Sequence, residues 1–417
     1  MKVLFLCGGI GKRMYPFTED KFLLKFLGKT LIEHQLEAAV KAGLRRFIIV
    51  ANPINLTRIE NIAARYQNAE FEFVVQEKPL GIANAVENAR HLLKDEVLLV
   101  NPNDIFENTA YAALLTARKK EKASALITGY KVKSYFPGGY LVVNAQGRLT
   151  GILEKPGPGN EPSDMVNILV HLHADPETLL HYISQVKTNE DDVYEQAIDA
   201  MCKDHRDIQV VPYTGVWTPI KYPWHVLDAV RYYLDRAEPR VSPDLRISPH
   251  AVLDGKVIIE DGVRILENAV IRGPVYIGRN AVIGNNALVR TYSHIGAECV
   301  VGFSTEIKES YVGDGTQFHM SYAGDSVIGS RCSFGAGTIT ANWRFDTKNV
   351  KVKVGDTMID TGRDKLGAFV GDNCRTGIQV GIMPGVRVGN NALIYAHVNL
   401  TNDVGADTIV HSQSPIR

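Results

Sequence analysis

The sequence lacks the features that would place the protein in a membrane or on a nucleic acid. No apolar stretch reaches the roughly 18 residues that a bilayer-spanning helix needs. The apolar run at the N-terminus is too short for a signal peptide, because two glycines follow after seven residues. An excess of one charge is also absent, since 46 basic residues balance 46 acidic ones. The composition therefore predicts neither a nucleic-acid partner nor a membrane partner.

Cysteine is scarce and scattered. The five cysteines are Cys7, Cys202, Cys299, Cys332 and Cys374. Their number is odd and no two of them form a CxxC pair, which excludes a disulfide framework and a zinc site as expectations. We expect a cytoplasmic protein whose cysteines are reduced and buried.

Residues 1–236 alternate β-rich runs with helix-like segments. The runs VLFLC, FIIVAN, FEFVVQ and EVLLVN are separated by segments such as TLIEHQLEAAVKAG and ANAVENARHLLK. This alternation is typical of an α/β domain with a mostly parallel, Rossmann-like sheet. Ligands of such sheets bind beyond the carboxyl ends of the strands, where the glycine-rich CGGIGKR lies. The Pro-punctuated segment 237–246 is the predicted linker.

A six-residue repeat occupies residues 247–417. Aliphatic residues stand at every sixth position: Ile247, Leu253, Ile259, Ile265, Ile271, Ile277, Ile283, Val289, Ile295, Val301 and Ile307. After an insertion of about 25 residues, roughly 343 to 369, the pattern resumes at Val370. Hexapeptide repeats of short strands and tight turns predict a left-handed parallel β-helix. A long irregular insertion in such a solenoid is usually functional.

Three interpretations compete for the N-terminal glycines. A dinucleotide fingerprint needs a third glycine where Met14 stands, and a Walker loop ending at Gly28 and Lys29 needs a glycine where Leu23 stands. What remains is GGxGxRMxP followed by a lysine. Over CGGIGKRMYPFTEDKFLLKFLGKTLIEH the sequence resembles the sugar-1-phosphate nucleotidylyltransferases.

This resemblance implies a triphosphate loop. Backbone N–H groups of Gly8, Gly9 and Gly11 would approach the triphosphate oxygens. Arg13 and Lys21 would be catalytic, because they can neutralise charge on the α-phosphorus and on the leaving pyrophosphate. The alternative is a tight strand-to-helix turn with surface cations.

Later segments resemble the same family in the expected order. In QEKPLGIANAV the resemblance implies that Gln76 pairs with the edge of a pyrimidine base and that Gly81 lets the backbone close on it. In LLVNPNDIF it places Asp104 at the Mg²⁺ site, a role that suits a carboxylate. In LTGILEKP it directs Glu154 and Lys155 to the sugar hydroxyls and the sugar phosphate.

The sequence departs from that family in several places: Asn103 replaces a glycine before Asp104, Ile82 replaces a threonine after Gly81, and Leu169 replaces a tyrosine of the sugar pocket. Asn167 replaces a glycine of the family's sugar pocket, where we still expect it to bind the sugar phosphate. In GVWTPIKYPWHVLDA, Pro219 stands where the family has its second metal ligand. Asp191, Asp192 and water are the candidates to replace that ligand.

The stretch HMSYAGDSVIGSRCSFGAGTITANWRFDTKNVKV resembles the acetyltransferase end of the bifunctional enzymes that make UDP-N-acetylglucosamine, in their archaeal-like form. The resemblance makes His319 the catalytic base, since an imidazole of pKa near 6.5 can accept an amine proton near neutral pH. A histidine on a β-helix is otherwise usually a solvated turn residue. The remaining implied roles are amino-sugar binding by Tyr322 and Asn342, phosphate binding by Lys348 and Lys351, and acetyl-CoA binding at Ala336.

Together the resemblances imply a bifunctional transferase of UDP-N-acetylglucosamine biosynthesis. It would acetylate glucosamine-1-phosphate or another hexosamine-1-phosphate with acetyl-CoA. With Mg²⁺ it would transfer a uridylyl or thymidylyl group from UTP or dTTP to a sugar-1-phosphate and release pyrophosphate. The alternatives are a monofunctional acetyltransferase with a degenerate nucleotidylyltransferase domain and a sugar-nucleotide-binding regulatory subunit. The resemblance also implies a homotrimer.

Overall fold

The computed structural model describes residues 1–9, 11–188 and 190–411. Its contacts divide the chain into two compact units. The first unit comprises Met1–Ile10 and Leu31–Trp217, and the second comprises Gly11–Thr30 and Thr218–Arg417. The predicted boundaries were a first domain at 1–236, a linker at 237–246 and a second domain at 247–417. The structure differs in two places, because the segments 11–30 and 218–246 both belong to the second unit.

The first unit is built on a nine-stranded mixed sheet with the order β10-β9-β11-β6-β1-β4-β5; in addition, β8 pairs with β11, and β12 pairs with β8. Strands β5, β4, β1 and β6 are parallel, whereas β11 runs antiparallel to β6, β8 and β9. The sheet is thus less uniformly parallel than predicted, because the hairpin β9-β10 and strand β11 return without a crossover helix. The strands are β1 (Lys2–Cys7), β4 (Arg46–Ala51), β5 (Glu70–Val75), β6 (Val97–Val100), β8 (Ala125–Lys131), β9 (Gly139–Val143), β10 (Leu149–Glu154), β11 (Met165–His173) and β12 (Ile208–Pro212).

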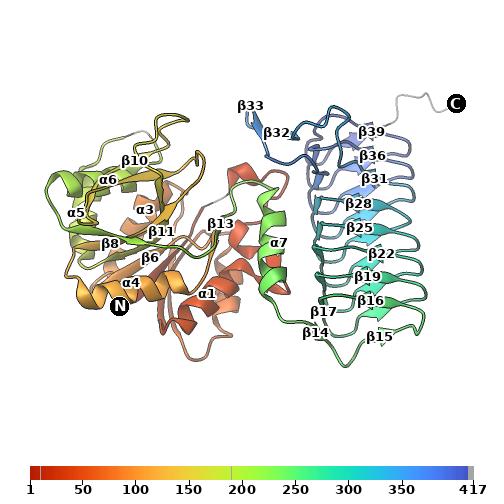
Figure 1. The fold of residues 1–417 in the computed structure, drawn as a ribbon, viewed down its shortest axis with the longest axis horizontal. Coiled ribbons are helices and arrows are strands. Elements are labelled where there is room, and N and C mark those ends of the chain that lie inside the picture. Colours follow the sequence, from red (N-terminus) through yellow and green to blue (C-terminus); the bar gives the residue numbers. More distant parts are fainter. Residues whose placement is uncertain (10, 189, 412–417) are drawn as a thin grey trace. The chain divides into compact units, whose positions relative to one another are not determined.

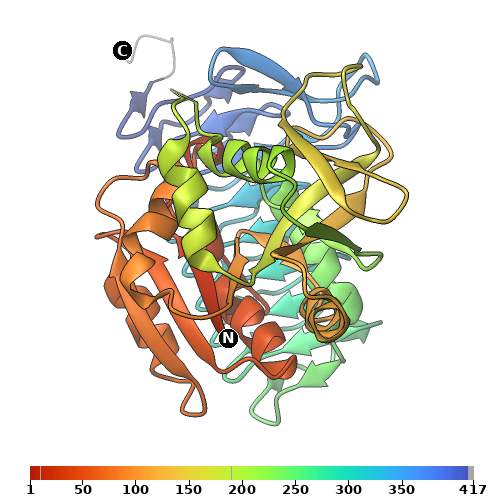
Figure 2. The same cartoon turned by 90° about the vertical axis from the view of Figure 1, so that its left-hand side faces the viewer.

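Helices cover this sheet, as the alternating sequence pattern predicts. Apolar side chains of α3, α5 and α6 join those of the strands in one buried cluster, and α5 and α6 lie in front of the strands in Figure 2. The helices of this unit are α1 (Leu31–Lys41), α2 (Leu56–Ala63), α3 (Gly81–Asn88), α4 (Thr109–Lys120), α5 (Pro176–Gln185) and α6 (Val193–Lys203), with the short elements η3 (Arg90–Leu92) and β7 (Asp104–Phe106) between them.

The second unit is a parallel β-helix of three sheets (Figure 1). Its first sheet contains β14 (Arg240–Val241), β17 (Val257–Ile259), β20 (Val275–Ile277), β23 (Ser293–Ile295), β26 (Tyr311–Val312), β29 (Val327–Ile328), β34 (Phe369–Val370) and β37 (Arg387–Val388). Its second sheet contains β15 (Arg246–Ile247), β18 (Arg264–Ile265), β21 (Val282–Ile283), β24 (Val300–Val301), β27 (Gln317–Phe318), β30 (Ser333–Phe334), β35 (Arg375–Thr376), β38 (Leu393–Ile394) and β40 (Ile409–Val410). Its third sheet contains β16 (Val252–Asp254), β19 (Val270–Arg272), β22 (Leu288–Val289), β25 (Glu306–Lys308), β28 (Tyr322–Gly324), β31 (Ile339–Thr340), β36 (Gly381–Ile382) and β39 (Asn399–Leu400).

The repeated aliphatic positions form the core of the β-helix, which confirms the predicted period. Ile259, Ile271 and Ile283 are fully buried, whereas Ile247, in the first coil, is 41% exposed. The helix begins earlier than predicted: β14 and β15 pair with β17 and β18, so the segment expected to be a linker already forms the first coil. The left-handed winding stays a prediction.

The predicted insertion lies between β31 and β34, and it holds a small antiparallel hairpin of β32 (Lys351–Val354) and β33 (Thr357–Asp360). The coil closes beyond the insertion, because Val327 pairs with Phe369 and Ile328 with Val370. The insertion therefore leaves the stacking of the coils intact.

The segment 11–30 and helix α7 (His225–Arg236) pack on the β-helix within the second unit. The segment holds η1 (Lys12–Met14), η2 (Lys21–Leu23), β2 (Lys25–Phe26) and β3 (Lys29–Thr30). The ring of Phe26 lies 5.3 Å from that of Tyr233 and 6.0 Å from that of Tyr311, measured between centroids. Buried aromatic contacts of this kind explain why the segment and α7 belong to the second unit.

Candidate active sites

Gly8, Gln76 and Gly81 lie together in the first unit. Gln76 is 3% exposed, and its Nε2 donates to the carbonyl oxygen of Gly81 at 3.1 Å and to Oδ1 of Asn84 at 2.9 Å. A Cβ on Gly8 would collide with Oε1 of Gln76, while a Cβ on Gly9 would meet no atom within 4 Å. A larger residue at position 8 would therefore displace the buried glutamine, whereas a side chain at position 9 would meet no neighbouring atom.

Gly81 begins helix α3 with a φ of +89°, in the left-handed region that favours glycine. A Cβ there would collide with the Asp191 carboxylate. Asp191 is thus a neighbour of Gly81. Sequence reasoning considered Asp191 only as a replacement metal ligand.

Asp104, at the start of β7, is half-buried and firmly held. Its Oδ2 accepts a hydrogen bond from Nε1 of Trp217 at 3.0 Å, and its carbonyl oxygen accepts one from Nε2 of Gln35 at 2.7 Å. Among the described residues there is no group of three or more acidic, histidine or cysteine side chains that could hold a metal. The donor set fits a Mg²⁺ ion that takes one carboxylate from the protein and its other oxygens from phosphates and water.

Glu154 and Asn167 face the same point of the sheet. A Cβ on Gly139 would lie 3.1 Å from Oε2 of Glu154 and 3.1 Å from Oδ1 of Asn167. Nζ of Lys155 forms an ion pair with Oε1 of Glu154 at 2.7 Å. The structure therefore brings together all three residues that were predicted to bind the sugar phosphate in this domain.

Sequence reasoning missed Glu195, in the first turn of α6. Burial, reinforced by the negative charge of Glu154, raises the pKa of Glu195 to about 8. Its carboxyl group is therefore mostly protonated at neutral pH. No motif or spacing in the sequence marks this residue.

The other predicted residues of the triphosphate loop, Gly11, Arg13 and Lys21, belong to the second unit. Gly11 has a φ of +45°. Nζ of Lys21 donates to the carbonyl oxygen of Ile220 at 3.0 Å. Arg13 is exposed.

A pocket of about 410 Å³ opens on the third sheet of the β-helix. It is lined by Arg290, Lys308, Tyr322, Asn342, Trp343 and Lys365. Tyr322 and Asn342 were predicted, whereas the other four were not. The first two of these, Arg290 and Lys308, are separated by one coil, like the paired residues Val270 and Leu288. Cations at that spacing in an otherwise aliphatic repeat are the signal that could have revealed them.

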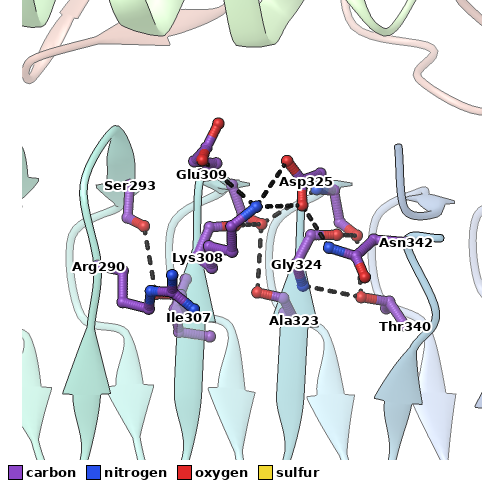
Figure 3. A network of polar contacts seen from close by, with 12 residues as sticks. Arg290, Ser293, Ile307, Lys308, Glu309, Ala323, Gly324, Asp325, Thr340 and Asn342 are labelled. Atoms are coloured by element: carbon purple, nitrogen blue, oxygen red, sulfur yellow. Dashed lines mark hydrogen bonds and ion pairs between the residues drawn. The ribbon is translucent and has the colours of Figure 1, made fainter. Parts of the chain in front are cut away.

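A polar network holds the pocket side chains in place (Figure 3). Nζ of Lys308 lies 2.8 and 3.1 Å from the two carboxylate oxygens of Asp325, and 3.3 Å from Oε1 of Glu309. NH1 of Arg290 donates to Oε1 of Glu306 at 2.8 Å. Burial opposes the charge of Lys308, but the hydrogen bond and charge of Asp325 outweigh it and raise the pKa of the lysine. Lys308 therefore stays cationic.

His319 lies at the corner between β27 and β28, three residues before Tyr322. Its backbone N–H donates to the carbonyl oxygen of Phe334 at 3.0 Å, and its side chain is exposed. Ala336 is half-buried and accepts a backbone hydrogen bond from Gln379 at 2.7 Å. Neither residue lines the pocket itself.

The two lysines predicted to meet the phosphate lie elsewhere in the insertion. Lys348 and Lys351 are exposed, and the lysine of the insertion that lines the pocket is Lys365. Nζ of Lys365 lies 5.3 Å from the centroid of the Trp343 ring. The insertion thus supplies both an aromatic face and a cation to the pocket.

Comparisons with known proteins match both parts of the chain. The family model for nucleotidyl transferase matches residues 2–220, and the model for bacterial transferase hexapeptide (six repeats) matches residues 256–291 and 367–402. The bifunctional sugar-1-phosphate nucleotidylyltransferase/acetyltransferase of Sulfurisphaera tokodaii is 36% identical over 97% of this chain and 98% of its own. The chain belongs to this bifunctional family.

Other members of the bifunctional family are similar over the same span. The bifunctional protein GlmU of Methanococcus maripaludis strain C7 is 37% identical, and that of Methanocaldococcus jannaschii is 33% identical, each over 100% of this chain and 98% of its own. The chain is accordingly an enzyme with a nucleotidyl transferase domain and a hexapeptide transferase domain.

A solved structure shares the fold of part of the chain. UDP-glucose pyrophosphorylase complexed with UDP-glucose aligns with a TM-score of 0.50 at 18% identity, over 57% of this chain and 99% of that one. At this identity the likeness supports the fold alone. Within the described residues, every helix is too short or too polar to cross a membrane.

Proposed function

We propose that this chain acetylates a hexosamine-1-phosphate with acetyl-CoA and transfers a uridylyl or thymidylyl group from UTP or dTTP to a sugar-1-phosphate. The observation that carries the first half is the β-helix pocket, which is lined by three cations and two hydrogen-bonding side chains. One of these, Tyr322, begins the strand that follows the corner at His319. Such a lining suits an anionic sugar that also carries polar groups.

In the acetyl transfer, His319 acts as general base. The amine nitrogen bonds to the thioester carbonyl carbon, the carbon–sulfur bond breaks, and His319 takes the proton that the amine gives up. The thiolate of coenzyme A leaves and is protonated. The phosphate of the sugar is bound by the cations of the pocket, Arg290, Lys308 and Lys365. Lys348 and Lys351 remain candidates for the same role. Ala336, without a long side chain, leaves room for the thioester.

In the nucleotidylyl transfer, an oxygen of the sugar-1-phosphate attacks the α-phosphorus in line and pyrophosphate leaves. Gly8, Gly9 and Gly11 offer backbone N–H groups to the phosphates, and Arg13 and Lys21 neutralise the charge that develops. The nucleotide base is bound by Gln76 and Gly81. The sugar phosphate is bound by Glu154, Lys155 and Asn167. Asp104 would hold Mg²⁺, which supplies additional positive charge beside the phosphates.

We also propose a homotrimer, which the resemblance in sequence implies, and a cytoplasmic location. The flat flanks of a long β-helix offer surfaces for association. A neighbouring copy could then complete the acetyl-CoA site, which one face of the coil alone does not enclose.

The test follows the two products separately. Purified protein is mixed with acetyl-CoA, glucosamine-1-phosphate, UTP and Mg²⁺, and free thiol and pyrophosphate are measured. We expect both to form, and we expect His319→Ala to abolish thiol release while pyrophosphate still forms from N-acetylglucosamine-1-phosphate. The matched control is His397→Ala, which changes another exposed histidine at a corner of the β-helix. Equal thiol release by His319→Ala would refute the acetyl-transfer proposal.

One observation favours a second candidate, a monofunctional acetyltransferase with a degenerate first domain. Pro219 has no side-chain ligand for a metal, so Asp104 is the one carboxylate that the family motif places at the metal. Under this candidate, thiol is released but pyrophosphate is absent with every nucleotide and sugar phosphate offered. Pyrophosphate from UTP or dTTP would exclude it, and binding of nucleotides without either product would indicate a regulatory subunit.

A further inference from the structure

A buried carboxylate lies behind the β-helix pocket. Asp325 is 5% exposed and does not line the pocket. Its backbone N–H donates to the carbonyl oxygen of Lys308 at 2.9 Å, and its own carbonyl oxygen accepts from the N–H of Gly367 at 2.8 Å. Its φ of +47° is unusual for a residue other than glycine, and such a conformation persists only where the surroundings fix it. Asp325 is therefore rigidly placed.

The Asp325 carboxylate holds two of the pocket's side chains at once (Figure 3). Both of its oxygens accept from Lys308, and Oδ2 also accepts from Nδ2 of Asn342 at 2.5 Å. Lys308 has a second acidic neighbour in Glu309, but Asn342 does not contact Glu309 in the described network. The two pocket residues thus depend on Asp325 to different degrees.

Asp325 decides which way the amide of Asn342 faces. An ionised carboxylate only accepts hydrogen bonds, so it can face the NH₂ group of the amide but not its oxygen. The second hydrogen of that NH₂ group is directed to the hydroxyl of Tyr322 at 3.2 Å. What Asn342 can offer a ligand in the pocket is therefore an acceptor, its Oδ1.

We propose that Asp325 is a positioning residue that makes the acceptor site selective for an amine over a hydroxyl. The inference rests on the proposed acetyl transfer. In its ammonium form the amine of the sugar only donates hydrogen bonds, so it needs the acceptor Oδ1 of Asn342. A hydroxyl both donates and accepts, so it gains no comparable advantage from a fixed acceptor. Without Asp325 the amide is free to turn and present its NH₂ group, which can donate to a hydroxyl but cannot pair with an ammonium group.

The experiment compares binding of glucosamine-1-phosphate with that of glucose-1-phosphate, by calorimetry on the full chain at pH 7.5. We expect the wild-type protein to prefer the amine by about tenfold or more, the effect of one well-placed hydrogen bond. In Asp325→Asn the preference falls below about threefold, because a neutral amide can face Asn342 with either end. Glucose-1-phosphate binds the variant about as well as it binds the wild type.

Two further variants separate positioning from simple neutralisation of Lys308. Glu309→Gln removes the other carboxylate beside Lys308 and should keep the wild-type preference. Asn342→Ala should lose the preference, and adding Asp325→Asn to it should cause no further loss, since the two act through one group. A loss in Glu309→Gln as large as that in Asp325→Asn, or a wild-type preference in Asp325→Asn, would overturn the proposal.

The proposal remains testable if Asp325→Asn does not fold, which a thermal melt reveals. In that case a wild-type preference in Asn342→Ala overturns it and a lost preference supports it. Thiol release by the wild-type protein is measured alongside. Preferential binding of the amine without thiol release would refute the acetyl transfer but not the selectivity.

Discussion

At the scale of single residues, Gly8 and Gly9 differ in the space that the structure leaves for a side chain, although they are neighbours in one motif. We predict that Gly8→Ala destabilises the protein by about 1–3 kcal/mol, because its Cβ would overlap the buried Gln76 side chain. Gly9→Ala should change stability by less than about 0.5 kcal/mol, since its Cβ meets nothing within 4 Å. Urea unfolding of both variants checks this, and equal losses would contradict it.

Glu195 gives a second prediction at this scale. Its pKa is raised from 4.5 to about 8, so between these values the folded state binds more protons than the unfolded state. Stability contributed by this group is full below pH 4.5 and is lost as the pH rises through 8. Relative to Glu195→Gln, the wild-type protein should lose up to about 1.4 kcal/mol per pH unit over this range. Unfolding of the two proteins at pH 6 and pH 8 measures the difference, and parallel pH profiles would refute it.

At the scale of elements, the contribution of a repeat residue to the free energy of unfolding depends on the coil in which it lies. Ile283 and Ile247 occupy the same hexad position, but Ile283 is 0% exposed and Ile247 is 41% exposed. We predict that Ile283→Ala costs about 2–5 kcal/mol, because it leaves a cavity between coils. The matched variant Ile247→Ala should cost less than about 1.5 kcal/mol. Denaturant unfolding of the β-helix tests the contrast.

At the scale of the whole molecule, the second unit contains the predicted phosphate-binding cations together with the β-helix. The hydroxyl of Tyr15, two residues after Arg13, donates to the carbonyl oxygen of Val404 at 2.7 Å. Oγ1 of Thr18 accepts from Nδ2 of Asn390 at 2.9 Å, and the guanidinium of Arg387 lies 5.1 Å from the centroid of the Tyr15 ring. The C-terminal coils thus anchor the segment that carries Arg13.

This anchoring predicts an effect on one activity alone. Tyr15→Phe should cost about 0.5–1.5 kcal/mol, the net value of one hydrogen bond. It should lower nucleotidylyl transfer several-fold while acetyl transfer stays at the wild-type rate, because the pocket of the third sheet does not include Tyr15. Rates of pyrophosphate and thiol release measure both. A fall in acetyl transfer with unchanged nucleotidylyl transfer would contradict the prediction.

The sequence predicted those features of the structure that depend on neighbouring residues along the chain or on a fixed period. The aliphatic hexads from Ile259 to Ile307 predicted the β-helix core, and the glycine and QEKPLG segments predicted residues that meet at Gly8, Gln76 and Gly81. The roles assigned to Asp104, Glu154 and Asn167 come from their place in family motifs, and these roles stay predictions.

What the sequence determined by itself is the periodic architecture, because a six-residue repeat permits one kind of stack whatever its surroundings. What only the tertiary structure decided is which charges meet across coils. Arg290 and Lys308 come from adjacent coils, but Lys365 comes from the insertion, and Asp325 acts through side chains before and after it in the sequence. Glu195 owes its raised pKa to burial, and the segment 11–30 owes its anchoring to C-terminal coils that follow it by almost 400 residues. These properties depend on distance and desolvation in three dimensions, which no one-dimensional pattern encodes.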